Sequence, residues 1–308
     1  MADFQLTLDE LREQIAQGKQ YTLTESFLHN NNVLIGTERI LTPKDLDRMD
    51  GKVYGPVRVK EFKSAGVDES LINETLQSCI YILKKHRDYE GLLAEKRKRV
   101  EQVFTNILPS HDYATLRLSQ LKKYSKRLFI HSVNTAIKSV LVDLAWQARH
   151  NQGLVNSIRF EDIIIAALLR NLGFLKTNQT VLAAKIGDLR QQQNELYLKV
   201  PRLSAAIIRN DAAKHNINET TARIIEESFE YLDGTGFPGA LRGEAIHPLA
   251  ILISACSGFD LLLSGERSQS ERSYMDINRR RMAMRGKFDP QTITIISEEF
   301  RYLRDSRG

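Results

Sequence analysis

The densest group of residues that could bind a ligand or a partner is the stretch Tyr231–Gly243, with the sequence YLDGTGFPGALRG. Its four glycines and one proline permit backbone conformations that other residues rarely adopt, so an ordered loop is expected here. The flanking segments have helical apolar patterns, and loops held by rigid helices often carry binding groups. A plain surface turn is the alternative. The candidate binding residues of this loop are Asp233, Gly234, Gly236, Phe237, Pro238 and Arg242.

Two clusters of basic residues could bind anions. Arg279, Arg280 and Arg281 are consecutive and are followed by Met282. They are either a solvated helix face with a methionine-lined underside or a phosphate clamp, because arginine binds phosphate through two parallel hydrogen bonds. The run Lys96–Arg99 is contiguous and so wraps around a helix, which favours a solvated surface over an anion site.

Several common catalytic motifs are absent from the sequence. It has no HExxH, GxGxxG, Walker or CxxC pattern, so zincin, dinucleotide-binding, P-loop and dithiol redox functions lack support. A literal His111-Asp112 pair does occur, but it follows Pro109-Ser110 rather than an apolar run. Asp112 or Ser110 is therefore predicted to cap a helix.

The composition is that of an ordinary globular protein. The 308 residues are 42% hydrophobic and 27% charged, and the net charge of +6 gives mild attraction to nucleotides, nucleic acids or acidic proteins, or simply aids solubility. Cys79 and Cys256 lie in apolar stretches and are expected to be buried thiols in a reducing compartment. The run Ile163–Leu169 is too short to span a bilayer, and Pro248–Leu263 is interrupted by polar residues. With no signal-peptide pattern, a cytoplasmic protein without membrane insertion is expected.

The first 66 residues predict a small α+β module. A helix over residues 7–17 has Thr7 as its cap, short strands are expected at 33–35 and 57–59, and a second helix starts at Thr42-Pro43.

Residues 67–108 predict a long connecting helix, and residues 109–308 predict a helical domain. The connecting helix starts at Asp68 and has an apolar stripe that is interrupted by Lys84–Arg87 and Gly91. Because it is apolar on one side only, it could also pair with a second copy of the chain. Beyond it, apolar residues at helical spacing predict helices over 160–174, 188–210, 218–229, 247–263 and 292–303.

These segments resemble the HD-GYP domains, which are bacterial cyclic di-GMP phosphodiesterases. DGTGFPGALRG resembles the family's signature loop, and Ile130–Asn134 resembles the start of its first core helix. Ala166–Phe174 is similar to its AALLHDxGK segment, Ala250–Leu262 to its ARIxxVADxYDAL helix, and Phe288-Asp289-Pro290 to its FDP turn. The resemblance covers about residues 111–300. It implies a mainly α protein, an HD-superfamily helical bundle preceded by the small module and the long helix.

The same comparison implies loss of the metal site. Family members hold two or three metal ions with His and Asp side chains, and His131 is retained here. The other ligand positions of the family are occupied by Arg170, Asn171, Val200, Ser228, Phe229 and Ser257. Catalysis in this family needs a metal-activated water, and an arginine repels a metal ion. The resemblance therefore implies a pseudoenzyme with no catalytic residues, no metal and no cofactor.

The first hypothesis is a catalytically inactive signalling protein that acts through protein–protein contacts in a bacterial cyclic di-GMP pathway, with a diguanylate cyclase domain as a possible partner. The alternative is a receptor that binds cyclic di-GMP or another nucleotide without cleaving it. A working phosphodiesterase with an unorthodox site and a general nucleic-acid-binding protein have less support. Outside the loop, the candidate binding residues are His131, Arg170, Asn171, Asp260 and Arg279–Arg281.

The cavity that holds the metal ions in members of the resembled family is expected to be filled by side chains in this chain. Val200, Phe229 and Phe174 would pack there, because burial of apolar side chains stabilises the fold. An unpaired buried charge is costly, so Arg170 is expected to reach solvent or to pair with Glu230 or Asp233.

Overall fold

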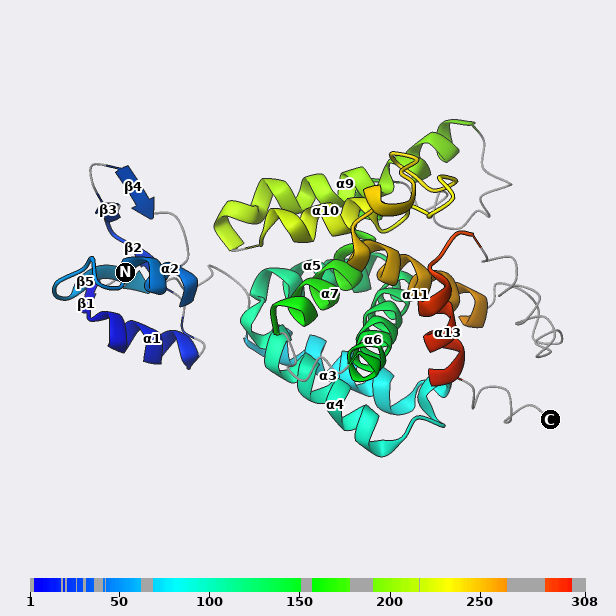
Figure 1. Ribbon diagram of the computed structural model, residues 1–308, viewed down its shortest axis with the longest axis horizontal. Helices are drawn as coiled ribbons and strands as arrows, with labels where there is room; N and C mark the ends of the chain where they lie inside the picture. The colour runs from blue at the N-terminus through cyan, green and yellow to red at the C-terminus, as the bar shows by residue number, and fades with distance from the viewer. Residues whose placement is uncertain are drawn as a thin grey trace. The chain divides into compact units, whose positions relative to one another are not determined.

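The computed structural model describes residues 3–61, apart from 18, 20, 26, 30, 31, 36–40 and 42, and residues 69–150, 157–177, 191–215, 217–264 and 286–300. It forms two compact units (Figure 1). The first comprises residues 1–67 and 209–218, and the second residues 68–208 and 219–308.

The N-terminal unit is a small α+β structure. Strands β1 (Asp3–Leu6), β5 (Val57–Glu61) and β2 (Tyr21–Leu23) form an antiparallel sheet in that order. Strands β3 (Phe27–His29) and β4 (Asn32–Ile35) form a separate antiparallel pair. The helices are α1 (Leu8–Ala16) and α2 (Pro43–Met49), so the predicted helix and strand positions are confirmed.

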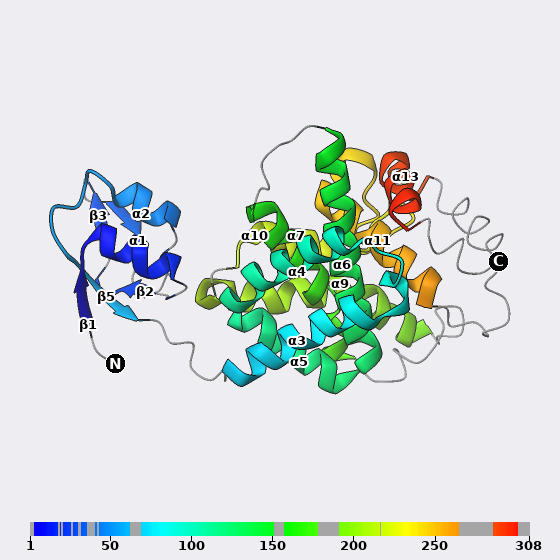
Figure 2. The ribbon, with the colours of Figure 1, turned by 90° about the horizontal axis from the view of Figure 1, so that it is seen from below.

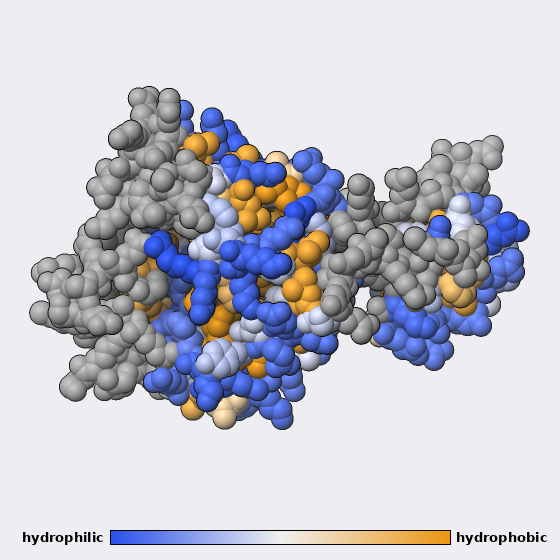
Figure 3. Space-filling view, turned by 180° about the vertical axis from the view of Figure 1, so that it is seen from behind, coloured by the Kyte–Doolittle hydropathy of each residue, from blue (hydrophilic) through white to orange (hydrophobic). Residues whose placement is uncertain are grey.

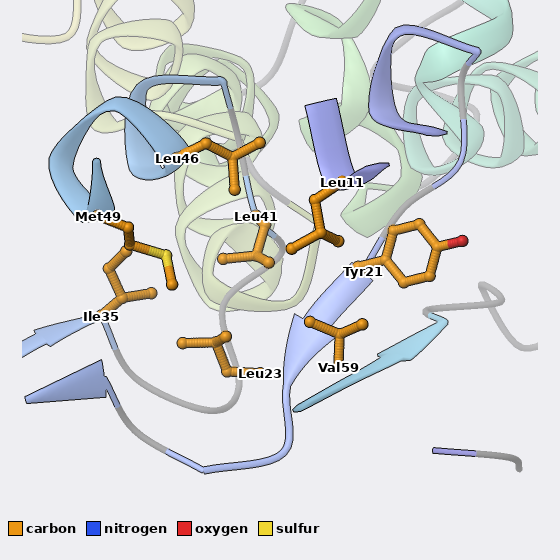
Figure 4. Close-up of a cluster of buried hydrophobic side chains, with 8 residues drawn as sticks. All are labelled: Leu11, Tyr21, Leu23, Ile35, Leu41, Leu46, Met49 and Val59. Atoms are coloured by element: carbon orange, nitrogen blue, oxygen red, sulfur yellow. The ribbon is translucent and has the colours of Figure 1, made fainter. Parts of the chain in front are cut away.

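Local sequence explains both the start of α1 and the core beneath it. Thr7 accepts a hydrogen bond from the backbone of Glu10, and the Glu10 carboxylate accepts one from the backbone of Thr7, which completes a capping box. The two helices bury their apolar faces on the sheet, and Figure 4 shows the resulting cluster. Its members are Leu11, Tyr21, Leu23, Ile35, Leu41, Leu46, Met49 and Val59.

The regular elements described in the second unit are all helices. Its first part contains α3 (Glu69–Lys85), η1 (Arg87–Tyr89), α4 (Ala94–Ile107), η2 (Leu108–Ser110), α5 (Asp112–Tyr124) and α6 (Lys126–Arg149). Its second part contains α7 (Ser157–Leu169), η3 (Leu172–Lys176), α9 (Gln191–His215), α10 (Glu219–Glu227), η5 (Gly243–Ala245), α11 (Pro248–Ser264) and α13 (Pro290–Glu299). The end of α9, from residue 209, belongs to the first unit. The helices confirm the predicted mainly α architecture.

Helix α6 is the central helix of this unit (Figures 1 and 2). It packs against α3, α4, α5, α7, α11 and α13. Its start is fixed by Ser125, whose side chain accepts a hydrogen bond from the backbone N–H of Leu128. Within the described residues, α6 alone is long and apolar enough to cross a bilayer. However, 78% of its most apolar segment is buried inside the protein, as expected for a core helix.

The prediction of one continuous connecting helix over 67–108 is wrong. Helix α3 ends at Lys85 and α4 begins at Ala94, and the segment between them turns the chain back so that the two helices pack together. Lys84 pairs with Glu101 across them at 2.9 Å. Tyr89 in the turn is fully buried, and this burial stabilises the turn between the two helices. In the sequence, the charged residues and Gly91 only interrupted the apolar stripe and did not by themselves predict a turn.

The predicted cap of α5 is also wrong. The N-cap position is His111, which has no side-chain cap hydrogen bond and pairs instead with Glu161 at 3.2 Å. Asp112 is the first residue of the helix, and Ser110 donates its hydroxyl to the carbonyl of Ile107.

Large apolar side chains are scattered on the surface. Figure 3 shows one face, on which hydrophobic residues alternate with hydrophilic ones rather than forming one continuous area. The most exposed large hydrophobic residues described in the second unit are Tyr81, Leu93, Leu198 and Leu261.

Candidate functional site

Arg170 lies at the centre of the site. It follows the fully buried end of α7, and its own side chain is buried, with only 3% of the residue exposed. The guanidinium donates through Nε to Ser228 Oγ at 3.2 Å, through Nη2 to the Ser228 carbonyl at 2.8 Å, and through Nη1 to Ser257 Oγ. It therefore joins the end of α7 to α11 and to the residues that follow α10.

The charge of Arg170 is stabilised by an aromatic ring. The guanidinium carbon lies 4.0 Å from the centroid of the Phe229 ring, a cation–π geometry in a desolvated place. Burial lowers the pKa of Arg170 to about 10, so the group is still charged at neutral pH. Among the described residues no carboxylate pairs with it, and the expectation of a partner in Glu230 or Asp233 is wrong. The oxygens of Ser228 and Ser257 and the ring of Phe229 stabilise the guanidinium instead of a carboxylate.

His131 links the arginine to an acidic group. Its Nε2 lies 3.1 Å from Ser257 Oγ, and its Nδ1 lies 2.6 Å from Asp260 Oδ2. Burial alone would raise the pKa of Asp260, but the positive charge of Lys138 and the hydrogen bond with His131 bring it below its usual range. Asp260 is therefore ionised. It is only 1% exposed, and its hydrogen bond holds the imidazole of His131 in one orientation.

Behind this pair lies a fully buried lysine. Lys138 Nζ donates to Asp260 Oδ1 at 2.7 Å and to Asp88 Oδ2 at 3.0 Å. Burial alone would lower the pKa of Lys138, but the two carboxylates raise it well above its usual value. The hydroxyl of Tyr89 lies 3.5 Å from Nζ and donates to Asn134 Oδ1 at 3.0 Å. Two acids and one ammonium thus form a buried ionic cluster.

Asn171 takes part in a separate contact. It leaves the helical conformation after α7, and its side-chain amide donates to Ser132 Oγ at 3.0 Å. Nearby, Ser204 on α9 donates to the carbonyl of Arg170 and accepts from the backbone N–H of Gly173, both at 2.7 Å. These bonds satisfy the free backbone groups at the end of α7.

Aromatic side chains cover the other side of the arginine. Rings contact in the order Phe174, Tyr197, Phe237 and Phe229, with centroid separations of 5.9, 5.5 and 5.3 Å. Val200 is fully buried and Phe174 is 5% exposed, so their predicted burial is confirmed, whereas Phe229 is half-buried. The phenylalanine of the loop is thereby joined to the side chains around Arg170.

The loop Tyr231–Gly243, hereafter the glycine loop, is held by Glu230. This buried carboxylate accepts hydrogen bonds from the backbone N–H groups of Gly239 and Leu241. Gly236 lies against the backbone of Glu230 so closely that a Cβ there would overlap it. The loop therefore has a defined backbone, and one of its glycines is required by close approach.

The start and end of the glycine loop pair with each other. Asp233 forms an isolated bridge with Arg242, and its carboxylate accepts from the backbone and the hydroxyl of Thr235. These hydrogen bonds lower the pKa of Asp233. Gly234 has φ of +78° beside the Arg242 side chain, which fulfils the prediction that glycines here supply left-handed backbone.

The predicted site residues therefore form two groups. His131, Arg170 and Asp260 meet around Ser257, and Asn171 lies beside them on Ser132. The loop residues Asp233, Gly234, Gly236, Pro238 and Arg242 form the second group, and Phe237 joins the two through Phe229. Arg279, Arg280 and Arg281 lie outside the described residues.

Sequence reasoning missed the ionic cluster of Lys138, Asp88 and Tyr89. A signal was present, because Lys138 is the only Asp, Glu, Lys or Arg residue between Leu128 and Val142. It lies seven positions after His131, two helical turns further along α6, so the two side chains share a face. A lone lysine in a buried helix needs an acidic partner.

Comparison with known proteins identifies the class. The family model of the HD domain matches residues 110–292, and the chain belongs to this family. The cyclic di-GMP phosphodiesterase PA4108 of Pseudomonas aeruginosa is 26% identical over 192 residues, which are 62% of this chain and 44% of that protein.

A second curated relative and a solved structure are also similar to this chain. The cyclic di-GMP phosphodiesterase PdeB of Borreliella burgdorferi is 30% identical over 134 residues, which are 44% of this chain and 32% of that protein. The chain thus spans less than half the length of both relatives. Bd1817, a HDG"Y"P protein from Bdellovibrio bacteriovorus, has a solved structure with a TM-score of 0.48, 15% identity, and coverage of 92% of this chain and 94% of that one.

The residues around Arg170 do not fit a metal centre of the kind that members of the resembled family hold. The part of the chain that the structure describes contains no group of three or more His, Cys, Asp or Glu side chains placed to hold a metal ion. Ser228 and Ser257 accept hydrogen bonds from the guanidinium. The nearby side chains that could act as metal ligands are neutral apart from Asp260, which already pairs with Lys138. Hydroxyl groups bonded to an arginine are poor ligands for iron, manganese or zinc.

Proposed function

We propose that this protein is a catalytically inactive member of the HD-GYP group that works by contacting another protein in a cyclic di-GMP signalling pathway. The observation that carries the proposal is the buried guanidinium of Arg170 on Ser228, Ser257 and the Phe229 ring. It occupies the place where the resemblance puts metal ligands.

The chemistry of phosphodiester hydrolysis supports inactivity. The family reaction needs a nucleophilic water activated by a metal ion and a Lewis acid at the phosphate. A fixed guanidinium supplies positive charge but does not generate hydroxide at neutral pH. His131 is the one imidazole near Arg170 among the described residues, and its two ring nitrogens already face Asp260 and Ser257.

The glycine loop is the proposed contact surface. Its backbone is fixed by Glu230 and by the Asp233–Arg242 bridge, so little conformational entropy is lost when a partner binds. The exposed residues of this rigid frame are Thr235, Gly239, Ala240 and Arg242. By resemblance to the family, a diguanylate cyclase domain is the partner to test.

A cyclic dinucleotide receptor is the second candidate. Two arginines lie at the glycine loop, since Arg202 donates to the Pro238 carbonyl at 3.1 Å and Arg242 pairs across the loop. Both side chains are exposed and suit phosphate, whereas Arg170 is buried and would need the aromatic side chains to move. Under this alternative, cyclic di-GMP binding weakens steeply with salt.

Two assays separate these functions. The purified protein is incubated with cyclic di-GMP and Mn²⁺ or Fe²⁺ under anaerobic conditions, with an active HD-GYP enzyme as the positive control. The proposal expects no linear dinucleotide product. Calorimetry at low salt then tests binding, and cyclic di-GMP binding that Arg242→Ala and Arg202→Ala abolish would move the receptor function ahead.

The partner is tested by biolayer interferometry against purified diguanylate cyclase domains. Arg242→Ala in the glycine loop is compared with Arg99→Ala, a matched loss of one exposed arginine on α4. The proposal expects that only the loop variant weakens binding. Equal effects of the two variants, or no binding to any cyclase domain tested, would reject this partner and this surface.

A further inference from the structure

A continuous series of buried polar contacts connects the α3–α4 turn, residues 86–93, with the glycine loop. It begins at Asp88 in η1, which binds Lys138 at 3.0 Å. The adjacent Tyr89 is fully buried and hydrogen-bonded to Asn134 of α6. Its carbonyl accepts from Arg97 of α4 at 2.6 Å, so the turn is held on both sides.

The middle of the series runs through one carboxylate. Asp260 uses Oδ1 for Lys138 at 2.7 Å and Oδ2 for His131 at 2.6 Å, so it transmits a displacement of either side chain to the other. His131 in turn contacts Ser257 at 3.1 Å. Asp260 and Ser257 lie on α11, and His131 and Lys138 lie on α6.

The series ends at the glycine loop. Ser257 accepts from Arg170, and Arg170 donates to both the hydroxyl and the carbonyl of Ser228. The next two residues after Ser228 act directly on the loop. Phe229 contacts Phe237, and Glu230 binds the loop backbone at Gly239 and Leu241.

The members balance one another in charge and hydrogen bonding. Lys138 and Arg170 carry two positive charges, and Asp88 and Asp260 carry two negative charges. Each of these four residues is at most 3% exposed, so water does not readily replace a lost partner. Moving Asp88 would leave Lys138 with Asp260 as its one carboxylate among the described residues, and would draw that carboxylate away from His131. The arrangement therefore favours concerted rather than independent movement.

We propose that this buried polar series couples the α3–α4 turn to the glycine loop, so that a displacement of the turn changes the order of the loop. Helix α3 is the first described helix after the N-terminal unit in the chain. A regulatory input that shifts α3 would thus alter the loop without any contact between the input site and the loop. The coupling is reciprocal, because both ends bias the same set of bonds. It holds whether the loop binds a protein or a nucleotide.

Hydrogen–deuterium exchange of the full chain tests the coupling. Asp88→Asn keeps the shape of the side chain but removes its charge from Lys138. We expect exchange in residues 229–243 to rise roughly 3- to 10-fold, a typical size for coupling between distant sites. Tyr89→Phe, which removes the bond to Asn134, is the milder second variant if Asp88→Asn folds poorly.

The matched control is Asp143→Asn. Asp143 is also a buried carboxylate and it pairs with Arg159 of α7 at 2.6 Å, but no bond in the series passes through it. We expect this variant to leave exchange in residues 229–243 unchanged after correction for global stability. An equal rise in the control, or no rise in Asp88→Asn and Tyr89→Phe, would overturn the proposal.

A double-mutant cycle gives the sharper result. Ser257→Ala removes the hydroxyl that bridges His131 and Arg170 while leaving both ends of the series intact. In this background Asp88→Asn should no longer change loop exchange, since the connection is already broken. If Asp88→Asn raises loop exchange by the same factor with and without Ser257→Ala, the effect travels by another route and the proposed series is rejected.

Discussion

Replacement of Phe229 tests the contact that stabilises the buried guanidinium. The ring is half-buried. Its centroid lies 5.3 Å from the centroid of the Phe237 ring and 4.0 Å from the guanidinium carbon of Arg170. Truncation of a fully buried phenylalanine costs about 3–5 kcal/mol, and a desolvated cation–π contact is worth about 1–2 kcal/mol. Because part of the ring is already exposed, Phe229→Ala should lower the free energy of unfolding by about 2–4 kcal/mol.

Phe229→Leu separates packing from the cation–π contact. It keeps an apolar side chain of similar volume but removes the aromatic face, so we expect a loss of about 1–2 kcal/mol. In an Arg170→Met background the cation is absent, and Phe229→Leu should then cost clearly less. The difference between the two costs is the coupling energy of the cycle.

Urea denaturation is the assay. The single tryptophan, Trp146, lies on α6, so its fluorescence reports on unfolding of the helical unit, and circular dichroism follows the whole chain. Equal m-values are needed before midpoints are compared. If Phe229→Leu costs the same in both backgrounds, the ring does not stabilise the guanidinium, and the account of how Arg170 is accommodated is refuted.

Three further predictions follow from single contacts. Glu230→Gln weakens the bonds from the backbone N–H groups of Gly239 and Leu241, so amide exchange of the glycine loop should rise while exchange in α6 stays unchanged. An unaltered loop would show that the carboxylate does not hold it. Because the pKa of Asp260 is lowered in the folded state, its contribution to stability is present above about pH 4 and is lost as the pH falls below that value. Asp260→Asn should therefore lose less stability than the parent chain between pH 5 and 3, and parallel pH profiles would contradict this. Burial raises the pKa of Cys79 and Cys256 to about 12, so the folded protein should not react with a thiol reagent at pH 8, and rapid native labelling would contradict the buried placement.

Much of the fold follows from sequence periodicity. The apolar spacing over residues 160–174 and the cap at Thr7 were sufficient to place α7 and α1, because both signals are local. The break after Lys85 was not predictable in the same way. It depends on the burial of Tyr89 and on its bond to Asn134, which lies 45 residues further along the chain.

The site was predicted in membership but not in bonding. His131, Arg170 and Asp260 were selected through family resemblance, and they do meet. The prediction that Arg170 pairs with an acidic residue was wrong, because Ser228, Ser257 and the Phe229 ring stabilise the guanidinium without a carboxylate. Lys138 was missed because its partners come from distant segments, and only the tertiary fold brings them together.

Metal content is the most direct test of the central claim that this chain lacks the catalytic centre of its family. The protein is purified anaerobically, incubated with excess iron, manganese or zinc, desalted and analysed by inductively coupled plasma mass spectrometry. The arrangement of Arg170, Ser228 and Ser257 predicts no stoichiometric metal under any of these conditions. One or more ions retained per chain, and lost in a His131→Ala variant, would contradict it.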